Sequence, residues 1–270
     1  MKITNINDVV VENVIINKDT THTVLGSELF ENNLSNIFIC SKKKSGKTCL
    51  IYNILDKCAD KRTNVIFFGS TIHIDSTYKE IFKMLEKKKI NYNTFNHFKE
   101  GKINHLDVIM MGLENPDIEI SDNDDDPYKA IPCCKFDDNN KKKKRKSKPK
   151  KKSPANIFVF DDLSSDLRDK TIEKLIKKNR HTKSMVIISS QYLQDIMPSS
   201  QKNLDYMIMF RSFSDDKLEI IHKNLDLSIK LPDLIGLYHF ATAEPYNFLY
   251  IDVRNEQYRK NFNKLIELET

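Results

Sequence analysis

A single short stretch constrains this chain more than any other. The apolar run Asn36–Cys40 leads into a cationic turn, then into Gly46-Lys47-Thr48 and a helix-like stretch, Cys49–Cys58. An apolar strand, a polar loop and a helix opened by Gly-Lys-Thr form the layout of a phosphate-binding loop, in which backbone N–H groups and the helix N-terminus hold anionic oxygens. Gly46 lets the backbone approach the phosphates closely. The pattern therefore predicts a nucleotide-binding α/β domain.

Within this interpretation, Lys47 reaches the β- and γ-phosphates of ATP and the Thr48 hydroxyl binds Mg²⁺. The predicted cradle consists of nine consecutive residues: Ser41, Lys42, Lys43, Lys44, Ser45, Gly46, Lys47, Thr48 and Cys49. Ser41 stands where the pattern G-x-x-x-x-G-K-[ST] has its first glycine, and a positive φ at a serine would cost about 1 kcal/mol. The alternative is a lysine-rich surface turn in front of a helix.

Two later strands end in polar groups suited to the same site. Asn156–Asp162 has four apolar residues followed by two carboxylates, as a Walker B strand does; Asp161 would hold Mg²⁺ and Asp162 would polarise the attacking water. Ser184–Gln191 places Gln191 at its carboxyl end, where it would sense the γ-phosphate or orient the water. The alternatives are a buried strand that exits into an acidic turn and an ordinary strand-end glutamine.

Strands alternate with helices along the rest of the chain, which predicts a P-loop NTPase of the α/β class with a mostly parallel central sheet and helices on both faces. The other expected strands are Thr63–Gly69, Tyr206–Arg211 and Asn247–Val253, with a small hairpin or edge strand near Val9–Ile16. The expected helices are Ser76–Lys89, Asp166–Lys178, Asp215–Leu225, Leu231–Thr242 and Glu256–Leu268. We expect an N-terminal extension over residues 1–30 and an ATPase domain over 31–270, interrupted by a flexible charged insertion at about 112–155.

Charge and hydropathy exclude several classes of protein. The net charge of +6 depends on Lys141–Lys152, where ten of twelve residues are basic, so the remainder of the chain is net negative and a uniformly basic DNA-coating protein is not indicated. The basic block could contact nucleic acid or act as a nuclear-import signal, or it could be a solvated tether. No apolar run is long enough for a membrane span and no secretory signal opens the chain, so an intracellular protein is expected.

With these motifs in place, the chain resembles the genome-packaging ATPases of large double-stranded DNA viruses, the poxvirus type, within the FtsK–HerA group. Ile157–Leu163 matches the second motif of the family, with Asp-Asp where many motors have Asp-Glu. Asn179-Arg180-His181, about six residues before Ile187–Gln191, matches the Arg-His and strand-Gln spacing. The segment Phe248–Phe262 is similar to the ending of giant-virus members.

The resemblance implies an ATP-driven translocase that assembles as a homo-oligomeric ring and moves viral double-stranded DNA into a capsid. It implies phosphate contacts to DNA without base readout, a capsid or portal-vertex protein as partner, and a place in the host cytoplasm or the virion, or in the nucleus given the basic run. An arginine from a neighbouring subunit would complete the site, contributing about 10³-fold or more to hydrolysis. Arg180 is slightly favoured over Arg211, with Arg168 and Arg254 behind them; the alternative for each is a surface ion pair.

Two other functions remain open from the sequence. One is a different P-loop motor, such as a helicase or a remodelling ATPase, although no further helicase motif is evident. The other is a non-hydrolysing nucleotide-binding scaffold, for which the serine at position 41 is the argument. The presence of Lys47, Thr48, Asp161 and Asp162 together favours an active enzyme.

Overall fold

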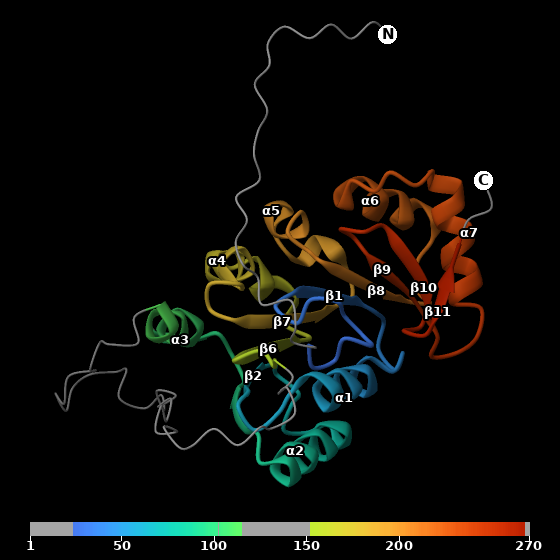
Figure 1. Cartoon of the computed structure of the whole chain (residues 1–270). Coiled ribbons are helices and arrows are strands. Elements are labelled where there is room, and N and C mark those ends of the chain that lie inside the picture. Colours follow the sequence, from blue (N-terminus) through green and yellow to red (C-terminus); the bar gives the residue numbers. More distant parts are fainter. Residues whose placement is uncertain (1–23, 102, 115–151, 268–270) are drawn as a thin grey trace, which may run out of the picture.

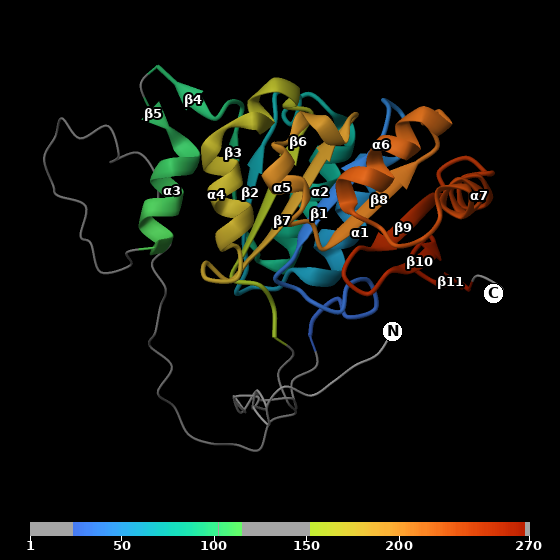
Figure 2. The same ribbon diagram turned by 90° about the horizontal axis from the view of Figure 1, so that it is seen from above.

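A nine-stranded sheet forms the centre of the molecule (Figure 1). The computed structural model describes residues 24–101, 103–114 and 152–267. The strands run in the order β11-β10-β9-β8-β1-β7-β6-β2-β3, and Figure 2 shows this succession across the molecule. Their bounds are β1 Asn36–Cys40, β2 Asn64–Phe68, β3 Asn91–Phe95, β6 Asn156–Asp161, β7 Ser184–Ser190, β8 Tyr206–Phe210, β9 Phe248–Asp252, β10 Gln257–Lys260 and β11 Lys264–Ile266.

Six neighbouring strands are parallel to one another: β8, β1, β7, β6, β2 and β3. Strands β9, β10 and β11 continue the sheet beyond β8 in antiparallel fashion. In a parallel sheet the carboxyl ends of all strands meet at one edge. Strand β1 lies between β7 and β8, and β6 lies on the far side of β7. The loop after β1 is therefore flanked by the ends of the strands that carry the other predicted site residues.

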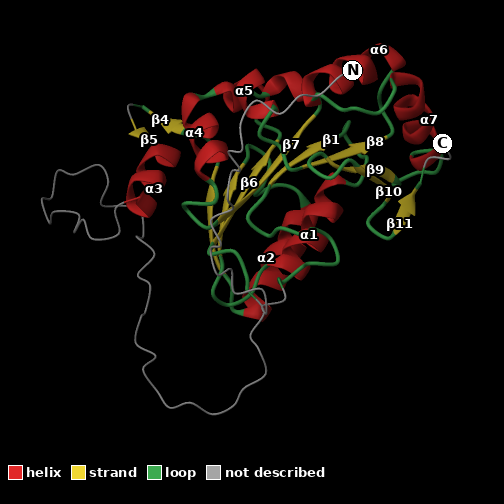
Figure 3. Cartoon of the chain, turned by 45° about the horizontal axis from the view of Figure 1, so that its top comes forward, coloured by secondary structure: helices red, strands yellow, loops and turns green. Residues whose placement is uncertain are grey.

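Helices cover both faces of the sheet, as Figure 3 shows, so the predicted fold class is confirmed. The helices are α1 Lys47–Cys58, α2 Ser76–Lys88, α3 His105–Glu114, α4 Lys170–Lys178, α5 Pro198–Gln201, α6 Asp215–Leu225 and α7 Leu231–Ala241. Alternate strand residues pack into two separate cores, because successive side chains of a strand point to opposite faces. Ile37 and Ile39 pack with α1 and α2, whereas Phe38 and Cys40 pack with α3, α4, α6 and α7.

The helices α1, α2, α6 and α7 lie within one residue of the predicted bounds at each end, apart from the start of α1, which begins two residues earlier. The helix expected over Asp166–Lys178 is divided into a 3₁₀ helix, Ser164–Arg168, and α4. The division falls at Asp169, whose carboxylate accepts a hydrogen bond from the Thr171 N–H at 2.8 Å and so caps α4.

The predicted closing helix, Glu256–Leu268, is wrong: this segment forms the hairpin of β10 and β11. Strand β10 pairs with β9, with Tyr258 opposite Ile251, and turns with positive φ at Glu256 and Asn261 enclose it. Without β10, strand β9 would leave a row of unpaired backbone groups at the edge of the sheet. Completing that ladder outweighs the local helix propensity of the segment.

Two short strands, β4 (Lys99–Glu100) and β5 (Ile103–Asn104), form a small hairpin in front of α3. Together with β3, they lie in a region for which the sequence analysis predicted no elements. The expected insertion at 112–155 lies mostly outside the described residues; residues 112–114 end α3 and residues 152–155 lead into β6. The expected hairpin near Val9–Ile16 also lies outside them.

The first described residues, from Val24 on, already pack against the ATPase domain. Val24 forms a parallel bridge with Lys152, and Leu29 and Phe30 are buried in the core beneath α1. None of the helices in the described ranges is both long and apolar enough to cross a membrane.

Candidate active site

The loop between β1 and α1 has the backbone conformation expected of a phosphate cradle. Gly46 is the N-cap of α1 with φ 98°, and Lys44 also has a positive φ of 64°. Such alternation of backbone handedness forms anion-binding nests of N–H groups. The first helical hydrogen bond runs from the Leu50 N–H to the Gly46 carbonyl at 3.0 Å, which leaves the N–H groups of the first turn without helical partners.

Ser41 does not carry the steric penalty considered from its sequence position. Its φ is not positive; the left-handed conformation in this part of the loop falls on Lys44 instead. The Ser41 N–H donates to the Ser190 carbonyl at 3.0 Å, so the residue continues the pairing of β1 with β7. Its hydroxyl is buried and has no hydrogen-bond partner within the described residues.

Lys47 and the two aspartates at the end of β6 come together, as the sequence predicted they would. The Lys47 Nζ lies 3.0 Å from Asp161 Oδ1 and 3.5 Å from Asp162 Oδ1. Asp161 is buried, whereas the Asp162 side chain keeps 23% of its surface exposed. Asp162 adopts a left-handed conformation with φ 58°, which aspartate tolerates better than most residues. The sharp turn ends β6 and brings the second carboxylate to the lysine.

Gln191 follows β7 and thus lies between the loop and the two aspartates. The strand registers place Ser190 beside Cys40 and Ser189 beside Asp161. The Gln191 backbone carbonyl accepts a hydrogen bond from the Cys40 thiol at 3.4 Å, which fixes the position of the residue. Its side-chain amide makes no hydrogen bond within the described ranges, so it is available to a ligand.

Tyr78, on α2, is a residue of this site that the sequence analysis assigned only to the core. It is fully buried, and its hydroxyl donates a hydrogen bond of 2.8 Å to Asp161 Oδ2. Burial, followed by the neighbouring Asp161 carboxylate, raises the pKa of Tyr78 well above its ordinary value, so the hydroxyl keeps its proton and stays a donor. The sequence signal that could have identified Tyr78 is its place in an apolar helical stripe, because a buried tyrosine hydroxyl needs a hydrogen-bond partner.

The four arginines considered from the sequence are divided between the two edges of the sheet. Arg211 follows β8 and Arg168 follows β6, so both lie at the carboxyl edge; Arg168 donates to the Gln194 carbonyl at 2.7 and 3.1 Å. Arg180 precedes β7 and lies at the opposite edge, where its guanidinium is 3.6 Å from Asp205. Arg254, after the antiparallel β9, is at that edge as well. Within one subunit the structure therefore does not bring Arg180 to Lys47.

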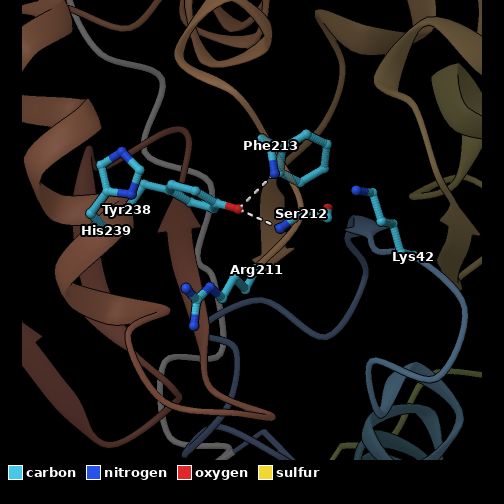
Figure 4. A pocket seen from close by; sticks show the side chains of 6 residues that line it. All are labelled: Lys42, Arg211, Ser212, Phe213, Tyr238 and His239. Atoms are coloured by element: carbon cyan, nitrogen blue, oxygen red, sulfur yellow. Dashed lines mark hydrogen bonds between the residues drawn. The ribbon is translucent and has the colours of Figure 1, made fainter.

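A pocket of about 480 Å³ adjoins the loop (Figure 4). Its lining comes from the loop, from the end of β8 and from α7: Lys42, Arg211, Ser212, Phe213, Tyr238 and His239. The Tyr238 hydroxyl accepts hydrogen bonds from the Ser212 and Phe213 N–H groups at 2.7 and 3.0 Å and donates to the Phe210 carbonyl. These bonds fix the chain that leaves β8, and with it the position of Arg211.

Comparison with known proteins gives two kinds of match. The model of the family described as Poxvirus A32 protein matches residues 129–258. No curated protein matches the sequence.

Among solved structures, the chain is similar to B204, the DNA-packaging ATPase from Sulfolobus turreted icosahedral virus, with 18% identity and a TM-score of 0.53 over 87% of this chain and 100% of that one. It is also similar to the genome packaging NTPase B204 from Sulfolobus turreted icosahedral virus 2 in complex with ATP-gammaS, with 16% identity and a TM-score of 0.52 over 85% of this chain and 98% of that one. At these identities the likeness concerns the fold. The resemblance to the poxvirus-type genome-packaging ATPases is thus confirmed, by the family model over residues 129–258 and by the P-loop ATPase fold over most of the chain.

Proposed function

We propose that this chain is an ATP-driven motor that packages viral double-stranded DNA into a capsid. The observation that carries the proposal is the meeting of Lys47 with Asp161 and Asp162 at the edge of the sheet where the phosphate loop opens. The family match and the DNA-packaging function of the structurally similar B204 point to the same activity.

The chain's own residues suffice to bind a nucleoside triphosphate. The N–H groups of residues 42–49 and the Lys47 ammonium would hold the phosphate oxygens, since the Ser41 N–H already donates to the Ser190 carbonyl. Thr48 and Asp161 would hold Mg²⁺, which when bound neutralises charge on the phosphates. The donor set fits such an ion, since the carboxylates of Asp161 and Asp162 already hold one cation, the Lys47 ammonium. With two protein ligands only, phosphate oxygens and water would complete the coordination.

Hydrolysis requires a water molecule to be oriented and deprotonated. Asp162 is suited to accept its proton, because its carboxylate is partly exposed and adjoins the buried Asp161. Gln191, with a free amide between the loop and Asp162, is suited to orient that water or to contact the γ-phosphate.

A neighbouring subunit would supply the arginine that stabilises the transition state. Arg211 is exposed on the site's own edge, whereas Arg180 lies on the opposite edge with 60% of its side chain exposed, so the two candidates require different faces of a ring to meet. Mixing an Arg180→Ala or Arg211→Ala subunit with an inactive Lys47→Ala subunit decides between them. Only the variant that lacks the trans arginine will regain activity in the mixture.

The remaining partners follow from the same proposal. The ring would contact double-stranded DNA through phosphates and a capsid or portal-vertex protein at the assembly site, in the infected cytoplasm or the virion. A nuclear location is an alternative that depends on the basic block Lys141–Lys152.

ATP hydrolysis by Lys47→Ala and Asp162→Asn, with and without double-stranded DNA, tests the proposal. We expect each variant to lose about 100-fold or more of the activity, because each removes a charge that acts in the transition state. Lys57→Ala, in the last turn of the same helix, is the matched control and should keep wild-type turnover. A wild-type chain that binds ATP but never hydrolyses it, at any protein concentration and with DNA present, would support the scaffold alternative instead.

A further inference from the structure

Tyr246 combines an exposed aromatic ring with a positive φ, at the third position of the turn that the Asn247 N–H closes on the Glu244 carbonyl at 3.3 Å. Its side chain is 72% exposed, more than Phe240 at 60% or Tyr192 at 44%, the other exposed aromatic side chains among the described residues. Its backbone adopts a left-handed conformation with φ 65°. Exposure of an aromatic ring forgoes the benefit of burial, and a positive φ at a bulky residue is strained. Strain of this kind gathers at ligand-binding sites.

The loop that carries Tyr246, residues 242–247, is anchored on both sides. The Thr242 hydroxyl donates to the Tyr238 carbonyl at 2.7 Å, and the Arg211 guanidinium donates to the Ala243 carbonyl at 3.4 Å. On the other side, Asn261 donates to the Asn247 side-chain oxygen at 2.9 Å. The ring is therefore exposed on a loop that is fixed in place.

The exposed ring lies directly against the phosphate loop. A Cβ added to Gly46 would come within 3.3 Å of Tyr246 Cδ1, so the ring covers the residue that opens α1. In the same loop, the hydroxyls of Ser41 and Ser45 are buried without a hydrogen-bond partner among the described residues, so both are free to contact a ligand.

We propose that Tyr246 is the platform on which the base of the bound nucleotide stacks. The inference rests on the proposed function, since it needs a triphosphate in the loop. A nucleotide held by its phosphates at the N-terminus of α1 must place its base on neighbouring surface, and an aromatic ring offers the base a flat apolar face. Stacking does not depend on hydrogen-bond readout, so the platform would accept either purine.

Binding measurements on the full chain test this assignment with two probes, ATPγS and inorganic triphosphate, each with Mg²⁺. The second probe has the phosphates but no base. We expect Tyr246→Ala to weaken ATPγS binding about tenfold and to leave triphosphate binding unchanged. Tyr246→Phe, which keeps the ring, should bind ATPγS within about twofold of wild type. Phe240→Ala removes an exposed aromatic side chain elsewhere and serves as the matched control.

The possible results separate the inference from the function on which it rests. If Tyr246→Ala binds ATPγS as tightly as wild type, the platform is wrong while the phosphate site stands. If it loses both probes equally, Tyr246 only supports the loop and the platform is likewise wrong. If the wild-type chain binds neither probe, the proposed function fails and the platform with it.

Discussion

At the amino edge of the sheet, the asparagines that open β1 and β6 donate hydrogen bonds to neighbouring segments, whereas at the carboxyl edge a lysine lies between two carboxylates. Asn36, the first residue of β1, donates through its side chain to the Ile176 and Asn203 carbonyls at 3.0 and 2.8 Å. Its backbone N–H donates to Asp205 at 2.8 Å. Asn156, the first residue of β6, donates to the Thr182 carbonyl at 3.1 Å.

The hydroxyls of Ser41 and Ser45 in the phosphate loop and of Ser189 near the end of β7 are buried without a hydrogen-bond partner in the described residues. The same holds at the amino edge for the hydroxyl of Ser35 and the side-chain oxygens of Asn36 and Asn156. Positive φ angles also occur at both edges, at Lys44 and Asp162 on the carboxyl side and at Lys183, directly before β7, on the amino side. Buried polar groups that the protein leaves unsatisfied cost stability unless a ligand or water satisfies them. What distinguishes the carboxyl edge is that Lys47, Asp161 and Asp162 lie together beside the phosphate loop. We therefore expect the amino edge to stabilise the fold and the carboxyl edge to bind the ligand. Substitutions at the two edges should fail in different ways.

The largest contrast is expected between two aspartates, the buried Asp161 and the half-buried Asp205. Asp161→Asn should reduce ATP hydrolysis about 100-fold or more, because it removes the charge next to Lys47 but keeps an acceptor for Tyr78. Asp205→Asn, at the amino edge, should leave hydrolysis within about twofold of wild type. Steady-state turnover of both variants checks this. Equal losses would mean that the two edges do not differ in function.

Asn36→Ala should act on stability alone. It removes two hydrogen bonds from a buried side chain and leaves their acceptors unpaired, at a cost of about 2 kcal/mol in the free energy of unfolding. Urea denaturation measures the change, and ATPγS affinity below the transition should equal that of wild type. Asn53→Ala, an exposed asparagine on α1, is the control and should change stability by about 0.5 kcal/mol or less.

Tyr78→Phe tests whether the Tyr78 hydroxyl supports Mg²⁺ binding at the carboxyl edge. Without its hydroxyl, Asp161 loses the partner of Oδ2, and we expect the Mg²⁺ concentration needed for half-maximal hydrolysis to rise about tenfold. Stabilisation of the fold by ADP with Mg²⁺, followed as the melting temperature, should shrink in parallel. Tyr92→Phe, which removes an exposed hydroxyl bound to Glu86, should change neither value. A purely structural role for Tyr78 would lower the melting temperature without altering the Mg²⁺ dependence.

The smallest effect concerns Asp205 and pH. Burial raises the pKa of Asp205, against the hydrogen bond from Asn36 and the charge of Arg180, which lower it. The folded state therefore binds the proton more readily than the unfolded state, and this contribution to stability is present at low pH and lost as the pH rises through the raised pKa. Lowering the pH from 7 to 4 should raise the stability of wild type relative to Asp205→Asn by about 1 kcal/mol or less. A change of opposite sign would contradict this account of the amino edge.

Residues in contiguous motifs could be predicted from the sequence. Asp161 and Asp162 were found because they end an apolar strand, and Lys47 because it stands in Gly-Lys-Thr after another. Parallel strands bring their carboxyl ends together, which joins the two motifs. The placement of Arg180 and Arg211 at opposite edges also follows from their positions before β7 and after β8. That consequence requires the strand directions, which the sequence analysis had predicted but did not apply to the arginines.

The rest depends on contacts between distant segments. The bond from Tyr78 to Asp161 joins residues 83 positions apart, and the periodicity of α2 only indicates that Tyr78 is buried. The hairpin of β10 and β11 was missed because its pairing with β9 decides its conformation. At Ser41 the sequence pattern suggested a strain that the backbone places on Lys44.

The most direct test of the central claim is displacement of a third strand from a DNA triplex by the wild-type chain, since displacement reports movement along double-stranded DNA. With ATP we expect displacement that depends on protein concentration, leaves the duplex intact and is absent in Asp162→Asn. Hydrolysis of ATP without displacement, or displacement accompanied by separation of the duplex strands, would contradict the assignment as a packaging motor.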